Sequence, residues 1–158
     1  MSRSMDIDDI LQQFKNKVLD TFIKEIQDTF PQKAFGYFLA SSYEGPVKEY
    51  IIFKDNIRKE YNELFEKYGN YYVTNNAGFV STPEETFKVE KYIQKNKLVK
   101  VGVFHSHQRH PALLSSIDAD LHPDQRLWHL LISLRNPLIP RIKIFSVING
   151  EVRELEYK

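Results

Sequence analysis

The chain has 158 residues, and its 22 lysines and arginines nearly balance 21 aspartates and glutamates, giving a net charge of +1 at neutral pH. Hydrophobic residues make up 42% of the chain and charged residues 27%, which is the composition of an ordinary globular domain. The balanced charge excludes binding driven by bulk attraction to nucleic acid or to an anionic membrane. No stretch has the apolar length of a signal peptide or a membrane span, so we expect a soluble, cytoplasmic protein.

The chain contains no cysteine. This excludes disulfides, iron–sulfur clusters, thiol nucleophiles and zinc sites built on thiolates. Any metal site must therefore use histidine, aspartate, glutamate and water.

The N-terminal part of the chain predicts a helix followed by a β-hairpin. Between residues 6 and 30 apolar side chains recur at steps of three and four, which predicts one helix that ends before Pro31. Residues 34–40 and 47–54 are rich in aromatic and β-branched side chains and flank a short polar turn. They are typical of two paired strands.

The stretch 55–78 is more polar, and it predicts a short helix around residues 58–67 and a strand at residues 71–74. A clear helix start follows. Thr82 is a predicted N-cap, Pro83 suits the first turn, and Glu85 completes a capping box.

This helix leads into a strand that ends in His-Ser-His. At a period of two, one face of the strand is predicted to carry Val99, Val101, Val103, His105 and His107.

Three further strands are predicted at residues 127–134, 141–148 and 151–157, the last two joined by an Asn149-Gly150 turn. Helices and strands interleave without repeats or linkers. We therefore predict a single α/β domain, of the α+β sandwich type, over residues 6–158, with a mixed β-sheet flanked by helices.

The residues that point to chemistry follow the pattern H-x-H-x(7)-S-x-x-D. His105 and His107 are two residues apart on a strand, so their side chains point the same way and can reach one cation. Asp118 is a candidate third ligand, and Ser115 is placed to cap the helix that Asp118 enters. Two imidazoles and one carboxylate leave one position of zinc open, which is typical of a catalytic site.

Each of these residues also has a purely structural interpretation. The two histidines could lie at an exposed strand end, Asp118 could only stabilise a helix N-terminus, and Ser115 could be a plain cap. His129 lies within an apolar strand, where we expect a hydrogen-bonded or edge residue. His110 and His122 do not fit the pattern and are expected in loops.

This pattern resembles the JAMM (MPN-plus) zinc metalloproteases, a family of deubiquitinating and ubiquitin-like isopeptidases with prokaryotic relatives that carry the JAB domain. The resemblance covers residues 7–157 and implies an architecture related to that of cytidine deaminases. It implies that His105, His107 and Asp118 bind zinc. It also implies that Ser115 supports the oxyanion of the reaction.

The resemblance fails at the position of the general base. The family has a glutamate there, in a Pro-x-Glu-x-x-Gly segment, but residues 31–36 of this chain carry Lys33 in its place. An ordinary lysine, with a pKa near ~10.4, is protonated at neutral pH and cannot accept a proton. Glu44 and Glu49 in the adjacent hairpin are candidates for a replacement carboxylate.

The resemblance implies hydrolysis of a peptide or isopeptide bond at the C-terminal tail of a ubiquitin-like or sulfur-carrier-like protein. The alternative, favoured by Lys33, is a zinc-binding interaction module that recognises such tails without cutting them. A zinc nucleobase deaminase is disfavoured, because the chain has neither cysteine ligands nor an H-x-E signature.

Overall fold

The computed structural model describes residues 6–15, 17–54, 81–108, 122 and 124–156. In chain order, its helices and strands are α1 (Ile7–Gln12), α2 (Val18–Thr29), β1 (Phe35–Ala40), β2 (Val47–Ile52), α5 (Pro83–Lys95), β3 (Val99–His107), β4 (Trp128–Ser133), β5 (Arg141–Ile148) and β6 (Glu151–Glu154).

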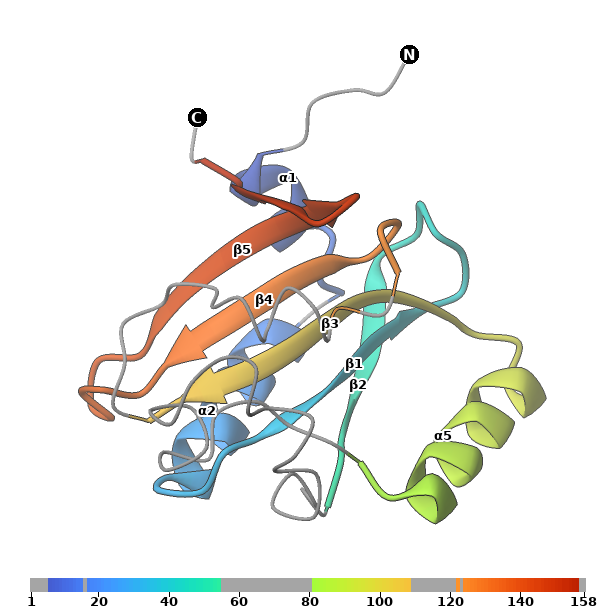
Figure 1. Cartoon of the computed structure of the whole chain (residues 1–158), viewed down its shortest axis with the longest axis horizontal. Helices are drawn as coiled ribbons and strands as arrows, with labels where there is room; N and C mark the ends of the chain where they lie inside the picture. The colour runs from blue at the N-terminus through green and yellow to red at the C-terminus, as the bar shows by residue number, and fades with distance from the viewer. Residues whose placement is uncertain (1–5, 16, 55–80, 109–121, 123, 157–158) are drawn as a thin grey trace.

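The strands form one six-stranded sheet in the order β2-β1-β3-β4-β5-β6 (Figure 1). β3 and β4 are parallel, and the other neighbouring strands are antiparallel. The described part of the chain is therefore an α+β fold built on a mixed sheet, as the sequence predicted.

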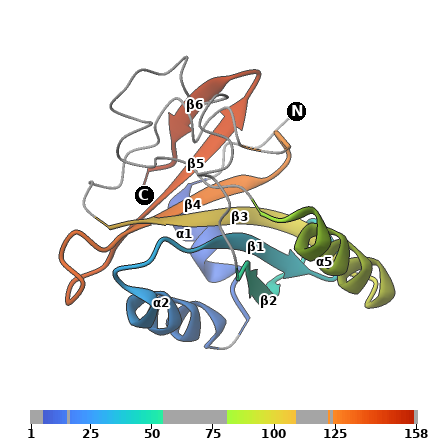
Figure 2. The ribbon, with the colours of Figure 1, turned by 60° about the horizontal axis from the view of Figure 1, so that its bottom comes forward.

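Helices cover the two faces of the sheet unequally. α1 and α2 lie together on one face (Figure 2), where they bury the largest apolar cluster among the described residues. Aromatic rings dominate its centre, and Phe22 of α2 makes edge contacts with Phe38 of β1 and Phe104 of β3 at centroid distances of 4.8 and 4.7 Å. α5 packs on the opposite face, where Val89 and Ile93 join a second cluster that includes β1 residues.

The prediction of one helix from Asp6 to Phe30 was wrong, because the structure has two. The backbone between α1 and α2 pairs instead with the start of β2. Val47 N donates to Gln13 O at 2.6 Å, and Lys15 N donates to Val47 O at 2.9 Å. These bonds use groups that a continuous helix would need, so the chain leaves the helix near Phe14 despite its periodic apolar pattern.

The predicted face of the histidine strand was also wrong in part. Val101 packs in the larger cluster with Phe104, and Val99 packs against the same cluster. The β1–β3 register shifts between Phe38 and Leu39, which leaves Val101 as an extra residue on β3. Such a bulge changes the alternation. As the neighbour of Phe104, His105 therefore faces the α5 side of the sheet, away from Val101.

The predicted N-cap and turn were correct, but the capping box was not confirmed: the Glu85 carboxylate accepts a hydrogen bond from Lys54 N. Thr82 accepts a hydrogen bond from Glu85 N at 3.1 Å and caps α5. Asn149 and Gly150 have φ values of 52° and 78° between β5 and β6, as a two-residue hairpin turn requires. The helix and strand predicted within 55–78 fall outside the described residues. Among the described helices, none is both long and apolar enough to cross a membrane.

The close approach of β1 to its neighbours gives a stability prediction. A Cβ on Gly36 would lie 1.8 Å from the carbonyl oxygen of Ile51 and 2.8 Å from Cζ of Phe104. We expect Gly36→Ala to lower the free energy of unfolding by at least ~3 kcal/mol, because the backbone of β2 must move. The control is Gly45→Ala, whose new Cβ would meet the exposed Ser42 hydroxyl at 3.0 Å. Equal urea midpoints for the two variants would contradict this packing.

Candidate functional site

The candidate site lies where the two parallel strands end. β3 and β4 run parallel and side by side, so their carboxyl ends lie at the same end of the sheet (Figure 1). The last residues of β3 are His105, Ser106 and His107, and Cα pairing places His107 opposite Ser133, the last residue of β4. The carboxyl ends of parallel strands are a common place for binding sites, because side chains from several strands converge there.

The structure brings the two predicted histidine ligands together. The Nε2 atoms of His105 and His107 face each other at 3.0 Å. Two imidazole nitrogens on one tetrahedral zinc lie about 3.3 Å apart, given Zn–N bonds of about 2.0–2.1 Å. His105 is buried, with 1% of its surface exposed, and His107 is half-buried at the surface. The geometry and chemistry of this pair therefore fit two ligands of one cation, reached from the side of His107.

Two other predicted site residues, Ser115 and Asp118, lie outside the described residues. Within the described part of the chain, no group of three or more His, Cys, Asp or Glu side chains could hold a metal ion. Asp118 as third ligand and Ser115 as oxyanion support therefore stay predictions from the sequence.

The segment that carries Lys33 runs directly beside the histidine pair. Ala34 accepts a hydrogen bond from Ser106 N and donates one to Ser106 Oγ, both at 2.8 Å. Ser106 is fully buried. No pattern in the sequence pointed to Ser106, because its side chain faces away from the histidines. Its two hydrogen bonds attach β3, at the position between the two histidines, to Ala34, the residue that follows Lys33.

The two glutamates considered as replacement bases are not near the pair. Glu49 is paired with Leu39, four residues along β1 from Phe35, which is opposite His105. This separation amounts to about 13 Å along the strand. Glu49 also accepts a hydrogen bond from the Tyr92 hydroxyl of α5 at 2.5 Å, and Glu44 lies farther away, in the turn after β1.

Two further histidines extend the cluster. His129 of β4 is fully buried, and its Nε2 lies 2.7 Å from Nδ1 of His105. Its Nδ1 lies 3.1 Å from Nδ1 of His122, which precedes β4. Burial lowers the pKa of His122, although backbone hydrogen bonds with Leu127 and Asp124 and the nearby Asp124 carboxylate act in the opposite direction. The expectation that His129 is hydrogen-bonded is confirmed, but β4 is a central strand and not an edge strand.

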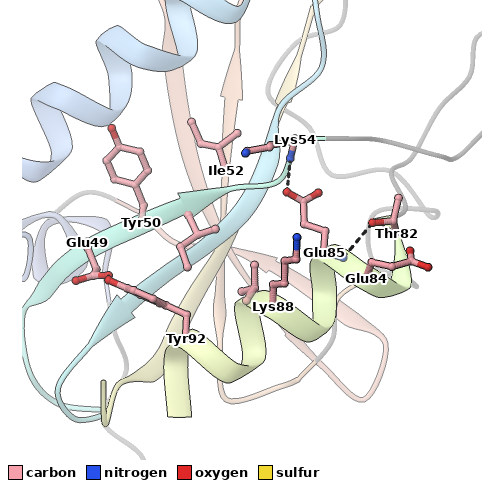
Figure 3. Close-up of a pocket in the computed structure, with 11 residues that line it drawn as sticks. Glu49, Tyr50, Ile52, Lys54, Thr82, Glu84, Glu85, Lys88 and Tyr92 are labelled. Carbon is pink, nitrogen blue, oxygen red and sulfur yellow. Dashed lines mark hydrogen bonds between the residues drawn. The ribbon is translucent and has the colours of Figure 1, made fainter. Parts of the chain in front are cut away.

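A groove of about 590 Å³ lies elsewhere, between β2 and α5 (Figure 3). Glu85 Oε2 accepts a hydrogen bond from Lys54 N at 2.7 Å, and the Tyr92 hydroxyl reaches Glu49 farther along α5. The hydrogen bond to Glu49 raises the pKa of the Tyr92 hydroxyl. The described residues that line the groove include none of the histidines. These contacts attach α5 to the outer strand of the sheet and do not belong to the candidate site.

Sequence comparisons assign no family. No protein-family model matches the chain, and no curated protein matches it.

Solved structures do match. Protein DSY2949 from Desulfitobacterium hafniense is 24% identical, with 90% of this chain and 88% of that chain covered and a TM-score of 0.62. A protein from Salinibacter ruber is 18% identical over the same shares, with a TM-score of 0.59. Their names state no activity, so these two likenesses support the fold alone.

A third solved structure is AF2198, a JAB1/MPN domain protein from Archaeoglobus fulgidus. It is 17% identical, with 88% of this chain and 92% of that chain covered, and the TM-score is 0.46. A likeness at this level carries no argument about the function of this chain.

The Ser106 contact gives a second stability prediction. Ser106→Ala leaves the buried N–H of Ala34 without its acceptor, so we expect the free energy of unfolding to fall by about 1–3 kcal/mol. Ser41→Ala is the control, because Ser41 is exposed in the turn after β1, and it should change stability by less than ~0.5 kcal/mol. Chemical unfolding of both variants measures the difference. A Ser106→Ala protein as stable as Ser41→Ala would show that the bond has no structural role.

Proposed function

We propose that this chain is a zinc-dependent hydrolase of the JAMM type, acting on a peptide or isopeptide bond at the C-terminal tail of a ubiquitin-like protein. The observation that carries the proposal is the pair of Nε2 atoms of His105 and His107, 3.0 Å apart at the end of β3. Its spacing to Ser115 and Asp118 in the sequence supplies the rest of the JAMM pattern.

Each of the chain's site residues would have its own role in this reaction. His105 and His107 would hold the metal from β3, and Asp118 would complete the ligand set. Zinc bound there would supply Lewis-acid catalysis for amide hydrolysis. Ser115 would donate a hydrogen bond to the developing oxyanion. Ser106, through Ala34, would keep the position of the general base beside the two ligands.

Lys33 supports a second candidate function. A protonated amine cannot start the proton transfer that the family assigns to a glutamate, and a nearby dication would repel it. Glu49 lies about 13 Å along the strand from the histidine pair and accepts a hydrogen bond from the Tyr92 hydroxyl. The strand β2 therefore offers no replacement base near the pair. The second candidate is therefore a zinc-binding interaction module that recognises the same tails without cutting them.

The metal prediction is common to both candidates. Purified protein from zinc-replete medium should contain about one zinc per chain, and the double variant His105→Ala, His107→Ala should contain none. Elemental analysis measures this directly. His110→Ala removes a histidine outside the pattern and should keep the metal. Zinc-free wild-type protein under these conditions would refute both candidates.

The base prediction separates the two candidates. On an isopeptide-linked ubiquitin-like substrate, we expect Lys33→Glu to cleave at least ~100-fold faster than the natural chain, because general-base catalysis contributes about 10²–10⁴-fold. Lys33→Gln is the control, since it removes the positive charge without supplying a base. Cleavage is followed by the appearance of the released protein.

The outcomes of the base experiment differ clearly. Cleavage by Lys33→Glu alone would identify the natural chain as the interaction module, with an intact site that lacks its base. Slow but zinc-dependent cleavage by the natural chain would support the hydrolase. Equal rates for all three proteins would contradict the placement of Lys33 at the position of the base.

A further inference from the structure

Four histidines form a continuous chain of ring contacts. His107 Nε2 lies 3.0 Å from His105 Nε2, and His105 Nδ1 lies 2.7 Å from His129 Nε2. His129 Nδ1 in turn lies 3.1 Å from His122 Nδ1. Only the first two histidines belong to the sequence pattern, so the function of His129 and His122 needs a separate explanation.

Strand pairing fixes the central contact of this chain. Parallel pairing places His129 opposite Val103 and His105 opposite Leu131, so the two imidazoles are diagonal neighbours on one face. Their rings are almost perpendicular, at 87°, with centroids 4.8 Å apart. Both residues are at most 1% exposed. The contact therefore belongs to the rigid interior of the sheet, and burial makes each ring nitrogen depend on a protein partner.

The tautomers along the chain are linked. A neutral imidazole has one N–H donor and one acceptor nitrogen. If His105 presents the lone pair of Nε2 to a cation, its proton is on Nδ1 and is donated to His129 Nε2. His129 must then carry its proton on Nδ1 and donate it to His122 Nδ1. His122 is left with its proton on Nε2.

His122 lies at the end of this order. Burial lowers its pKa and favours the neutral ring, whereas backbone hydrogen bonds with Leu127 and Asp124 and the Asp124 carboxylate act in the opposite direction. Its Nε2 is buried and has no hydrogen-bond partner among the described residues. A proton on this atom has no described acceptor, so the tautomer of His105 is inferred from its contact with His129 and not from His122.

We propose that His129 is a positioning residue of the metal site, and that the relay from His122 through His129 holds His105 in the tautomer whose Nε2 can bind a divalent cation. The inference rests on the proposed function, because it assumes that the two strand histidines bind metal. It adds two residues that the H-x-H-x(7)-S-x-x-D pattern does not contain. Partners of this kind orient metal-binding imidazoles in other proteins and typically contribute about 10–100-fold to metal affinity.

The first readout is the tautomer itself. ¹⁵N NMR of the histidine rings in metal-free protein should show His105 and His129 protonated on Nδ1 and His122 on Nε2. In His129→Leu, which fills the buried position without a ring nitrogen, His105 should become a mixture of tautomers. An unchanged His105 signal in that variant would overturn the relay.

The second readout is zinc affinity, measured by competition with a chelator of known affinity. His129→Leu should bind zinc about 10–100-fold more weakly than the natural chain. His129→Gln should recover most of this loss, because its side-chain oxygen can accept the His105 Nδ1 proton. Leu130→Val is the matched control, since it alters the core on the opposite face of β4 and should leave affinity unchanged.

The outcomes separate the relay from the proposed function. Zinc affinity of His129→Leu within twofold of the natural chain would overturn the positioning role while leaving the metal site in place. Equal weakening in His129→Leu and His129→Gln, with both proteins folded, would also overturn it, because packing would then explain the loss. A natural chain that binds no zinc would refute the proposed function, and the tautomers of the metal-free protein would still test the relay by itself.

Discussion

The parallel pairing of β3 with β4 is the contact on which the rest of the site depends. It is the one parallel pair among the described strands, and it makes both strands end at the same edge of the sheet. This pairing places His129 next to His105. On the other side of β3, antiparallel pairing with β1 brings Ala34 to Ser106. Two strands from distant parts of the sequence, β1 and β4, therefore fix one short segment of β3, and the histidine pair is held from both sides.

The two faces of the sheet carry different side chains, and this difference allows the polar histidine cluster to be buried on one of them. The face under α1 and α2 is packed with aromatic and aliphatic side chains, and Phe104 and Ser106 are fully buried there. The face under α5 carries the histidines. Burying imidazoles costs free energy unless their nitrogens are hydrogen-bonded, and here the rings meet that need largely through one another. The same contacts that offset the burial also link the positions of the protons on neighbouring rings.

The parts of the fold that depend on residues close together in the sequence could be predicted. The cap at Thr82, the Asn149-Gly150 turn and the hairpin of β1 and β2 all follow from local chemistry. The break between α1 and α2 could not be predicted, because it depends on hydrogen bonds that Val47 donates to Gln13 and accepts from Lys15, more than thirty residues away. The bulge at Val101 arises in the same way from pairing with β1. A periodic pattern describes a helix or strand in isolation and carries no information about such long-range bonds.

The sequence by itself determined that any metal site must be free of thiolates and that two histidines point the same way from one strand. These conclusions need only composition, the period of a strand and the spacing of a motif. Only the tertiary structure decided that His129 and His122 join the pair and that Ser106 anchors the segment of Lys33. The reason is physical: the contact of His129 with His105 spans 24 residues and exists because β4 lies beside β3. Strand order follows from how the whole core packs, which no local pattern of residues records.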